Sequence, residues 1–102
     1  MAKFLFVYRA PKNYKVGTAS AIDAWSKWFD DLGDNVVERG NPVFESATVG
    51  NSGSDGMALG GYSLIAADDL EEALTLAKGC PFVGQGGDVE VGSITVLDGP
   101  VA

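Results

Sequence analysis

The sequence predicts an α+β domain in which two helices cover one face of a four-stranded antiparallel sheet. Its final third follows the pattern strand, helix, tight stop and strand with almost no linker. A similar strand and helix open the chain, and a loosely alternating stretch lies between the two halves. The elements therefore follow the order β-α-β-β-α-β. Their expected ranges are 3–9, 43–49, 60–67 and 88–96 for strands, and 20–39 and 68–78 for helices.

The first strand and the first helix are predicted from residue spacing. Residues 3–9 are apolar on both faces, which is typical of a central strand covered on both sides. Ser20 followed by Asp23 resembles a capping box, and apolar residues then recur every three or four positions, as on one side of a helix. Gly33 is expected to bend this helix and Gly40 to end it. The predicted apolar stripe consists of Ile22, Trp25, Phe29, Leu32 and Val36.

The second half shows the clearer signals. Asp68 is the expected N-cap of the second helix, and Glu71 stands where it would complete a capping box. The apolar phase of the last strand changes across Gly92-Ser93, which predicts a bulge there. The predicted buried stripe of the second helix consists of Leu70, Ala73, Leu74 and Ala77.

The order of elements is that of the split βαβ, or ferredoxin-like, arrangement. Right-handed crossovers place the first and third strands at the centre of the sheet. Two helices cover only one face, whereas both central strands carry apolar side chains on both faces. A second copy of the chain is the simplest cover for the remaining face. We therefore expect a single domain over 1–102 that forms a homodimer with its sheets packed face to face.

The composition argues against several functional classes. Acidic residues outnumber basic ones 14 to 7, for a formal charge of -7, so nucleic-acid binding is not expected. The chain has no histidine and one cysteine, which argues against an internal disulfide, a multi-cysteine metal site and histidine catalysis. We expect neither a cofactor nor a metal. No apolar run approaches the roughly 20 residues that cross a bilayer, and the start does not resemble a signal peptide, so we expect no membrane association and a cytoplasmic location.

Several short segments, spread over nearly the whole chain, together carry a family resemblance. They are Lys3-Phe4-Leu5-Phe6-Val7-Tyr8, Ala24-Trp25 to Leu32-Gly33, Gly40-Asn41-Pro42, Gly60-Gly61-Tyr62, Ala66-Ala67-Asp68-Asp69-Leu70-Glu71-Glu72-Ala73, Ala77-Lys78-Gly79-Cys80-Pro81 and Gly86-Gly87-Asp88-Val89-Glu90-Val91. In this order they resemble the YCII-related proteins, and in particular the DGPF-domain branch. The resemblance implies a dimeric α+β barrel of ferredoxin-like units and little chemistry.

Two features of this chain depart from the family pattern. Some relatives carry a His and an Asp thought to form an active site, but this chain has no histidine and has Cys80 where they place Asp. That pair therefore does not carry over. The DGPF signature is also not intact, and Asn41-Pro42-Val43-Phe44 stands in its neighbourhood.

The candidate ligand-binding residues each have a structural alternative. Arg9 either binds an anion or pairs with an acid such as Glu90. Asp88 and Glu90 share one strand face, where they either bind a metal or share a proton, or else form a solvated edge or pair with Arg9. Trp25 is expected in the core, whereas Trp28 is expected to flank a cleft or a subunit contact. The full candidate set is Tyr8, Arg9, Trp28, Glu45, Tyr62, Asp88 and Glu90.

The lone cysteine is a weak candidate for a nucleophile. Cys80 follows the C-terminal end of a predicted helix, where the helix dipole disfavours a thiolate. We expect it to be buried and inert.

Two hypotheses of function follow. In the first, the protein binds a small molecule in an apolar cleft between the helix-free sheet face and the partner subunit, either as a binding protein or as a weak enzyme without a cofactor. The polar points of that cleft would be Tyr8, Arg9, Glu45, Tyr62 and Glu90. In the second, it is a non-catalytic module that serves the assembly or regulation of a partner protein.

Overall fold

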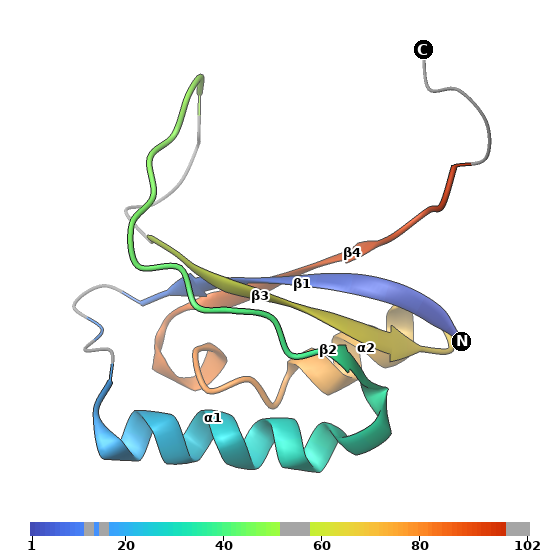
Figure 1. Cartoon of the computed structure of the whole chain (residues 1–102), viewed down its shortest axis with the longest axis horizontal. Coiled ribbons are helices and arrows are strands. Elements are labelled where there is room, and N and C mark those ends of the chain that lie inside the picture. Colours follow the sequence, from blue (N-terminus) through green and yellow to red (C-terminus); the bar gives the residue numbers. More distant parts are fainter. Residues whose placement is uncertain (12–13, 15–16, 52–57, 98–102) are drawn as a thin grey trace.

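A computed structural model of the chain shows an α+β architecture with one four-stranded antiparallel sheet and two α-helices (Figure 1). It describes residues 1–11, 14, 17–51 and 58–97. Within this part of the chain, no helix is both long enough and apolar enough to span a bilayer. The elements in chain order are β1 (Ala2–Ala10), α1 (Ala19–Leu32), the 3₁₀ turn η1 (Gly33–Asn35), β2 (Val36–Glu38), β3 (Ala58–Ala67), α2 (Leu70–Ala77), the 3₁₀ turn η2 (Val83–Gln85) and β4 (Asp88–Ser93).

The sheet has the strand order β2-β3-β1-β4, and all neighbouring strands are antiparallel. This order is compatible with the ferredoxin-like arrangement, and it places the first and third strands, β1 and β3, at the centre as predicted. β1 and β3 pair from Ala2 opposite Ala67 to Ala10 opposite Ala58. Both helices lie on the same face of the sheet (Figure 1).

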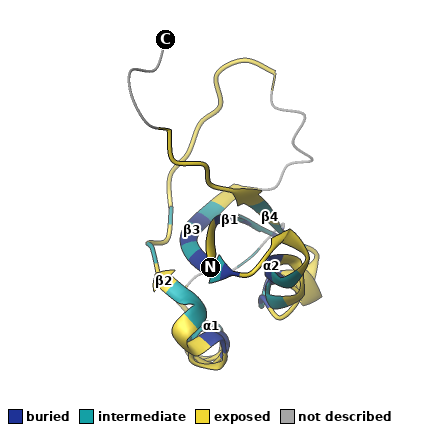
Figure 2. Cartoon of the chain, turned by 90° about the vertical axis from the view of Figure 1, so that its right-hand side faces the viewer, coloured by how far each residue is buried: buried dark blue, intermediate teal, exposed yellow. Residues whose placement is uncertain are grey.

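The alternation of side chains divides the sheet into a covered face and an open face. On the covered face, Phe4, Phe6 and Tyr8 are buried beneath the helices. The open face carries the alternate positions of the central strands, among them Leu5, Val7 and Leu64, which are half-buried. Figure 2 shows the same alternation of buried and half-buried residues along β3.

The core between the sheet and the helices is mostly aromatic. Trp28 of α1 lies at its centre, with ring-centroid distances of 6.4 Å to Phe6 and 5.9 Å to Tyr8. Its indole N–H donates to the backbone oxygen of Leu76 in α2, at 3.3 Å. One side chain therefore joins both helices to the sheet.

The first helix begins and ends at different residues from those predicted. Its N-cap is Thr18 rather than Ser20, and the Thr18 hydroxyl accepts a hydrogen bond from the backbone N–H of Ala21 at 3.2 Å. The helix ends at Leu32, because Gly33 adopts a φ of +56°, which stops a helix rather than bending it.

The predicted strand at 43–49 was wrong, and the second strand is the short β2 that follows η1. Val36 accordingly belongs to a strand and not to the stripe of the first helix. Pro42 forms only an isolated bridge to Gly61. The neighbours of Pro42 make the hydrogen bonds of this bridge, from Tyr62 N–H to the Asn41 oxygen and from Val43 N–H to the Gly60 oxygen, and the chain leaves the edge of β3 after them.

The second helix is capped one residue later than predicted. The Asp69 carboxylate accepts from the backbone N–H of Glu72 at 2.8 Å, and the Glu72 carboxylate accepts from the N–H of Asp68 at 3.0 Å. Ala73 and Ala77 are buried as predicted. The two leucines of the predicted stripe, Leu70 and Leu74, are instead exposed, because the helix turns its alanines and Leu76 toward the core.

The last strand ends where a bulge was expected. β4 stops at Ser93, and the chain then leaves the sheet after one hydrogen bond, from the N–H of Ile94 to the backbone oxygen of Lys3 at 3.0 Å. The change in apolar phase therefore marks the end of the strand. Val96 and Leu97 beyond it are exposed.

Candidate functional site

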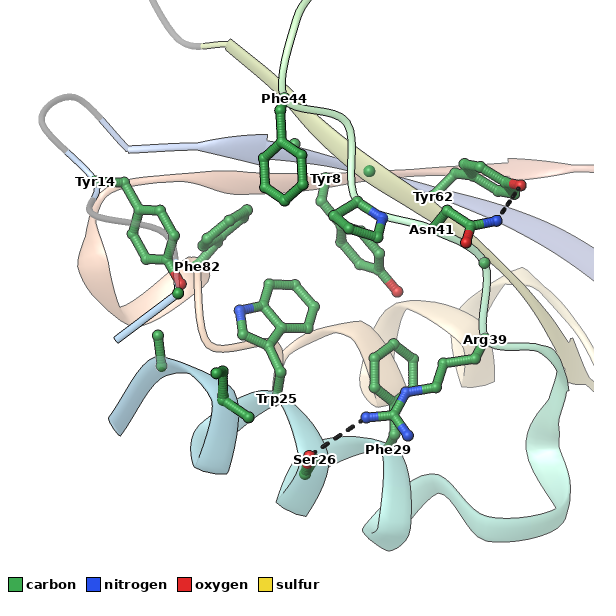
Figure 3. A pocket seen from close by; sticks show the side chains of 17 residues that line it. Tyr8, Tyr14, Trp25, Ser26, Phe29, Arg39, Asn41, Phe44, Tyr62 and Phe82 are labelled. Carbon is green, nitrogen blue, oxygen red and sulfur yellow. Dashed lines mark hydrogen bonds between the residues drawn. The ribbon is translucent and has the colours of Figure 1, made fainter. Parts of the chain in front are cut away.

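A pocket of about 420 Å³ lies on the helix side of the sheet, between α1 and residues 39–44 (Figure 3). We call residues 39–44 the strap. The volume falls within the roughly 300–1,000 Å³ that is typical of small-molecule sites. Most of the surface is apolar, and aromatic residues from segments far apart in the sequence contribute to it. The aromatic lining residues are Tyr8, Tyr14, Trp25, Phe29, Phe44, Tyr62 and Phe82.

Trp25 organises the aromatic wall. Its ring centroid lies 4.9 Å from that of Tyr8 and 4.9 Å from that of Phe82, edge to face in both cases. Phe82 in turn lies 4.7 Å from Tyr14 in the same geometry. Edge-to-face pairs of this kind stabilise the rings in place. The wall is therefore preformed by contacts among its own residues.

The strap is hydrogen-bonded to the edge of β3. The N–H of Val43 donates to the backbone oxygen of Gly60 at 3.1 Å, and the N–H of Tyr62 donates to that of Asn41 at 3.4 Å. The side-chain amide of Asn41 also donates to the Tyr62 hydroxyl at 3.2 Å (Figure 3). Gly40 permits this close approach, because a β carbon there would lie 1.8 Å from the backbone oxygen of Tyr62. The strap therefore forms a fixed wall of the pocket.

A buried chain of hydroxyl groups connects the pocket floor to the strap. The Tyr8 hydroxyl donates to Oγ of Ser63 at 2.7 Å, and the Ser63 hydroxyl donates to the backbone oxygen of Arg39 at 2.6 Å. Burial raises the pKa of Tyr8 well above its ordinary value, so its phenol stays protonated at neutral pH. Tyr8 is thus a hydrogen-bond donor that positions the strap and not a proton acceptor.

Arg39 is the charged side chain of the pocket lining in the described part of the chain. Its guanidinium carbon lies 4.6 Å from the ring centroid of Phe29, over the ring face. One N–H group donates to the Ser26 hydroxyl at 3.4 Å (Figure 3). Among residues 1–11, 14, 17–51 and 58–97, no carboxylate lies within 4.0 Å of it. Its positive charge is therefore available to a ligand.

The structure brings together only part of the candidate set. Tyr8 and Tyr62 line the pocket. Trp28 is buried in the core and Trp25 lines the pocket, which reverses the expected roles of the two tryptophans. The reason is that Trp28 contacts both Phe6 and Tyr8 of β1, whereas Trp25 contacts Tyr8 and then the pocket wall. Glu45 is exposed just after the strap and does not contribute to the lining.

Arg9, Asp88 and Glu90 form a separate cluster on the open face. Nη1 of Arg9 lies 2.9 Å from Oδ1 of Asp88, and Nη2 pairs with the Glu90 carboxylate. Hydrogen bonds to Glu90 and then to Asp88 raise the pKa of Arg9, which stays charged. Its guanidinium pairs with two acids. Of the two interpretations of Arg9, pairing with an acid such as Glu90 is therefore the one observed.

Cys80 is buried, as predicted, with 3% of its surface exposed. Burial raises the pKa of its thiol to about 11, so the thiolate that a nucleophile needs is scarce at neutral pH. The described residues contain no group of three His, Cys, Asp or Glu side chains that is arranged to hold a metal ion.

Sequence reasoning missed most of the pocket. Tyr14, Phe44 and Phe82 are dispersed aromatics without a shared period, and only the tertiary fold brings them together. Arg39 was assigned to the end of a helix, where a basic residue is unremarkable. The useful signal was local: Arg39 directly precedes Gly40-Asn41-Pro42, a break in the sequence pattern that separates β2 from the strap.

The pocket is equipped for binding more than for acid-base chemistry. Its described lining contains no Asp, Glu, Cys or Lys, and the phenol of Tyr8 stays protonated. No protein-family model matches this chain, and no curated protein matches it either.

Proposed function

We propose that this protein binds a small, largely apolar aromatic molecule in the pocket between α1 and the strap. The observation that carries the proposal is the preformed aromatic space of about 420 Å³. At about 25 cal/mol per Å², burying roughly 200 Å² of ligand surface contributes about 5 kcal/mol before the costs of association. Affinities no tighter than the submillimolar to millimolar range are therefore expected from this term.

The proposed site is not the cleft expected from the sequence. That cleft was placed between the open face and a partner subunit, whereas this pocket lies within one chain, on the helix side. The difference follows from the strap: because residues 43–49 do not continue the sheet, a gap remains between the strap and α1. Tyr8 and Tyr62 belong to both versions of the site.

Two alanines of α1 provide a matched test of this proposal. Ala21 lines the pocket, whereas Ala24 is exposed on the same helix outside it. We expect indole and 4-methylphenol to raise the melting temperature of the wild-type protein. Ala21→Phe fills the pocket and should weaken their binding at least about tenfold, while Ala24→Phe should bind as the wild type does.

Thermal shift and isothermal titration calorimetry measure both effects, and circular dichroism confirms that each variant folds. Equal binding by the two variants would place the ligand elsewhere. No binding to the wild type, across aromatic probes at millimolar concentration, would contradict the proposal itself.

We also propose that two copies of the chain pack through their open faces, the homodimer expected from the sequence. Supporting it are the apolar side chains Leu5, Val7 and Leu64 on that face. The segments 43–51 and 94–97 extend from the sheet on the same side, away from the helices (Figure 1). They carry exposed apolar residues, including Val49 and Val96, that are suited to flank a second copy. Membership of the YCII-related family, which implies such a dimer, stays a prediction, as does a cytoplasmic location.

One substitution on each side of the molecule tests the dimer. Leu64→Glu places a charge at the centre of the open face and should shift the protein from dimer to monomer at micromolar concentration. Leu74→Glu, on the exposed side of α2, should leave the dimer intact. Sedimentation velocity measures the mass. A monomeric wild-type protein would contradict the dimer and would favour the second hypothesis, in which the protein serves the assembly or regulation of a partner protein.

A further inference from the structure

The charge of the pocket differs from that of the chain. Acidic residues outnumber basic ones 14 to 7 in the sequence. The described pocket lining nevertheless contains no acid and one base, Arg39. A ligand with a negative group would therefore meet an opposite charge there, although the molecule as a whole is an anion.

Arg39 is also unlike Arg9, the other arginine of the chain. The charge of Arg9 is balanced by two carboxylates, whereas the described partners of the Arg39 guanidinium are the ring of Phe29 and the Ser26 hydroxyl, through a long hydrogen bond. A guanidinium has five N–H groups, so most of its donors remain for a ligand. Figure 3 shows the Arg39 side chain reaching from the strap toward Ser26 and Phe29, beside the aromatic wall. A ligand lying against Trp25 therefore has a cation at one end of its site.

We infer that the ligand is an aromatic molecule bearing a single carboxylate, with its ring against Trp25 and its carboxylate on Arg39. This inference rests on the proposed function. A planar carboxylate matches the fork of a guanidinium, and such charge-assisted hydrogen bonds are about twice as strong as neutral ones. A phosphate dianion would leave one charge uncompensated by the described lining. Aromatic cages also bind quaternary ammonium groups, but Arg39 would repel them.

The test compares an acid with its neutral isostere, 2-naphthoate with 2-naphthamide, by calorimetry at neutral pH. The wild-type protein should bind 2-naphthoate about tenfold more tightly than the amide, and added salt should reduce this preference. Arg39→Gln should abolish the preference by weakening the acid alone. Lys27→Gln removes an equal charge from the exposed side of α1, next to Ser26, and should keep the preference.

The possible failures are distinguishable. If both naphthalene probes bind the wild type equally, or if Arg39→Gln retains the preference, the carboxylate assignment is overturned while the proposed pocket stands. Tighter binding of phenyltrimethylammonium than of 2-naphthoate overturns it in the same way. If neither naphthalene probe binds while indole and 4-methylphenol do, the inference fails and the proposed function stands. If none of the four probes binds, both fail.

Discussion

Gly40→Ala is expected to destabilise the protein by about 3 kcal/mol or more, a cost that combines backbone strain with a direct clash. The backbone of Gly40 has a φ of +79°, which L side chains rarely adopt. An added β carbon would also lie 1.8 Å from the backbone oxygen and 2.7 Å from the backbone carbon of Tyr62. These atoms belong to a central strand and cannot move aside cheaply. The strap must therefore detach from β3, and ligand binding should be lost together with stability.

Gly33→Ala is the matched control for Gly40. Gly33 also has a positive φ, +56°, but nothing lies within 4 Å of its added β carbon. Backbone strain alone then applies, at about 1–3 kcal/mol, because the ψ of -123° at Gly33 lies outside the left-handed helical region. The loss should therefore be smaller than that of Gly40→Ala. Urea unfolding followed by circular dichroism measures both variants. Equal losses for the two would show that the strap does not press against β3 as described.

Trp28→Ala should cost about 3–5 kcal/mol in the free energy of unfolding, since it deletes the largest side chain of the core. Trp28 is 6% exposed and contacts the rings of Phe6 and Tyr8. The substitution also removes the hydrogen bond to Leu76 that joins α1 to α2. Trp28→Phe should lose less, because most of the apolar volume is retained.

Trp25→Ala separates stability from binding. Trp25 is half-buried and lines the pocket, so its loss should destabilise the protein less than that of Trp28. Binding of aromatic probes, in contrast, should fall at least about tenfold, because the ring at the centre of the wall is gone. Denaturant unfolding and calorimetry measure the two quantities. A larger stability loss for Trp25→Ala than for Trp28→Ala would mean that their assigned roles are reversed.

Much of the fold could be predicted, because a long strand has a recognisable apolar pattern in the sequence. The apolar residues on both faces of 3–9 and 60–67 predicted two central strands, and the structure places β1 and β3 there. The second strand was missed because β2 is only 3 residues long. Val36 also continues the three-and-four spacing of the preceding helix. The alternation over 43–49 is typical of a strand, but it does not show whether a partner strand lies close enough for hydrogen bonding.

The site was less predictable, because its chemistry depends on which charged side chains are missing from the described pocket lining as well as on which belong to it. Tyr8 and Tyr62 were among the candidates, but Arg39 was not. Arg39 matters because no described carboxylate pairs with it, a property of the tertiary structure and not of the sequence. The roles predicted for the two tryptophans were interchanged, because a helical stripe shows only approximately which side of the helix is buried. Trp28, and not Trp25, is the buried tryptophan of the core.

The indole N–H signals of the two tryptophans offer the most direct test of the central claim, that an aromatic acid binds between α1 and the strap. In a ¹H–¹⁵N NMR titration with 2-naphthoate, the signal of Trp25 should move. That of Trp28, bonded to Leu76 in the core, should remain nearly in place. Backbone signals of Gly40 and Gly60, which line the pocket, should shift with Trp25. Shifts confined to Leu5, Val7 and Leu64 on the open face would contradict the account.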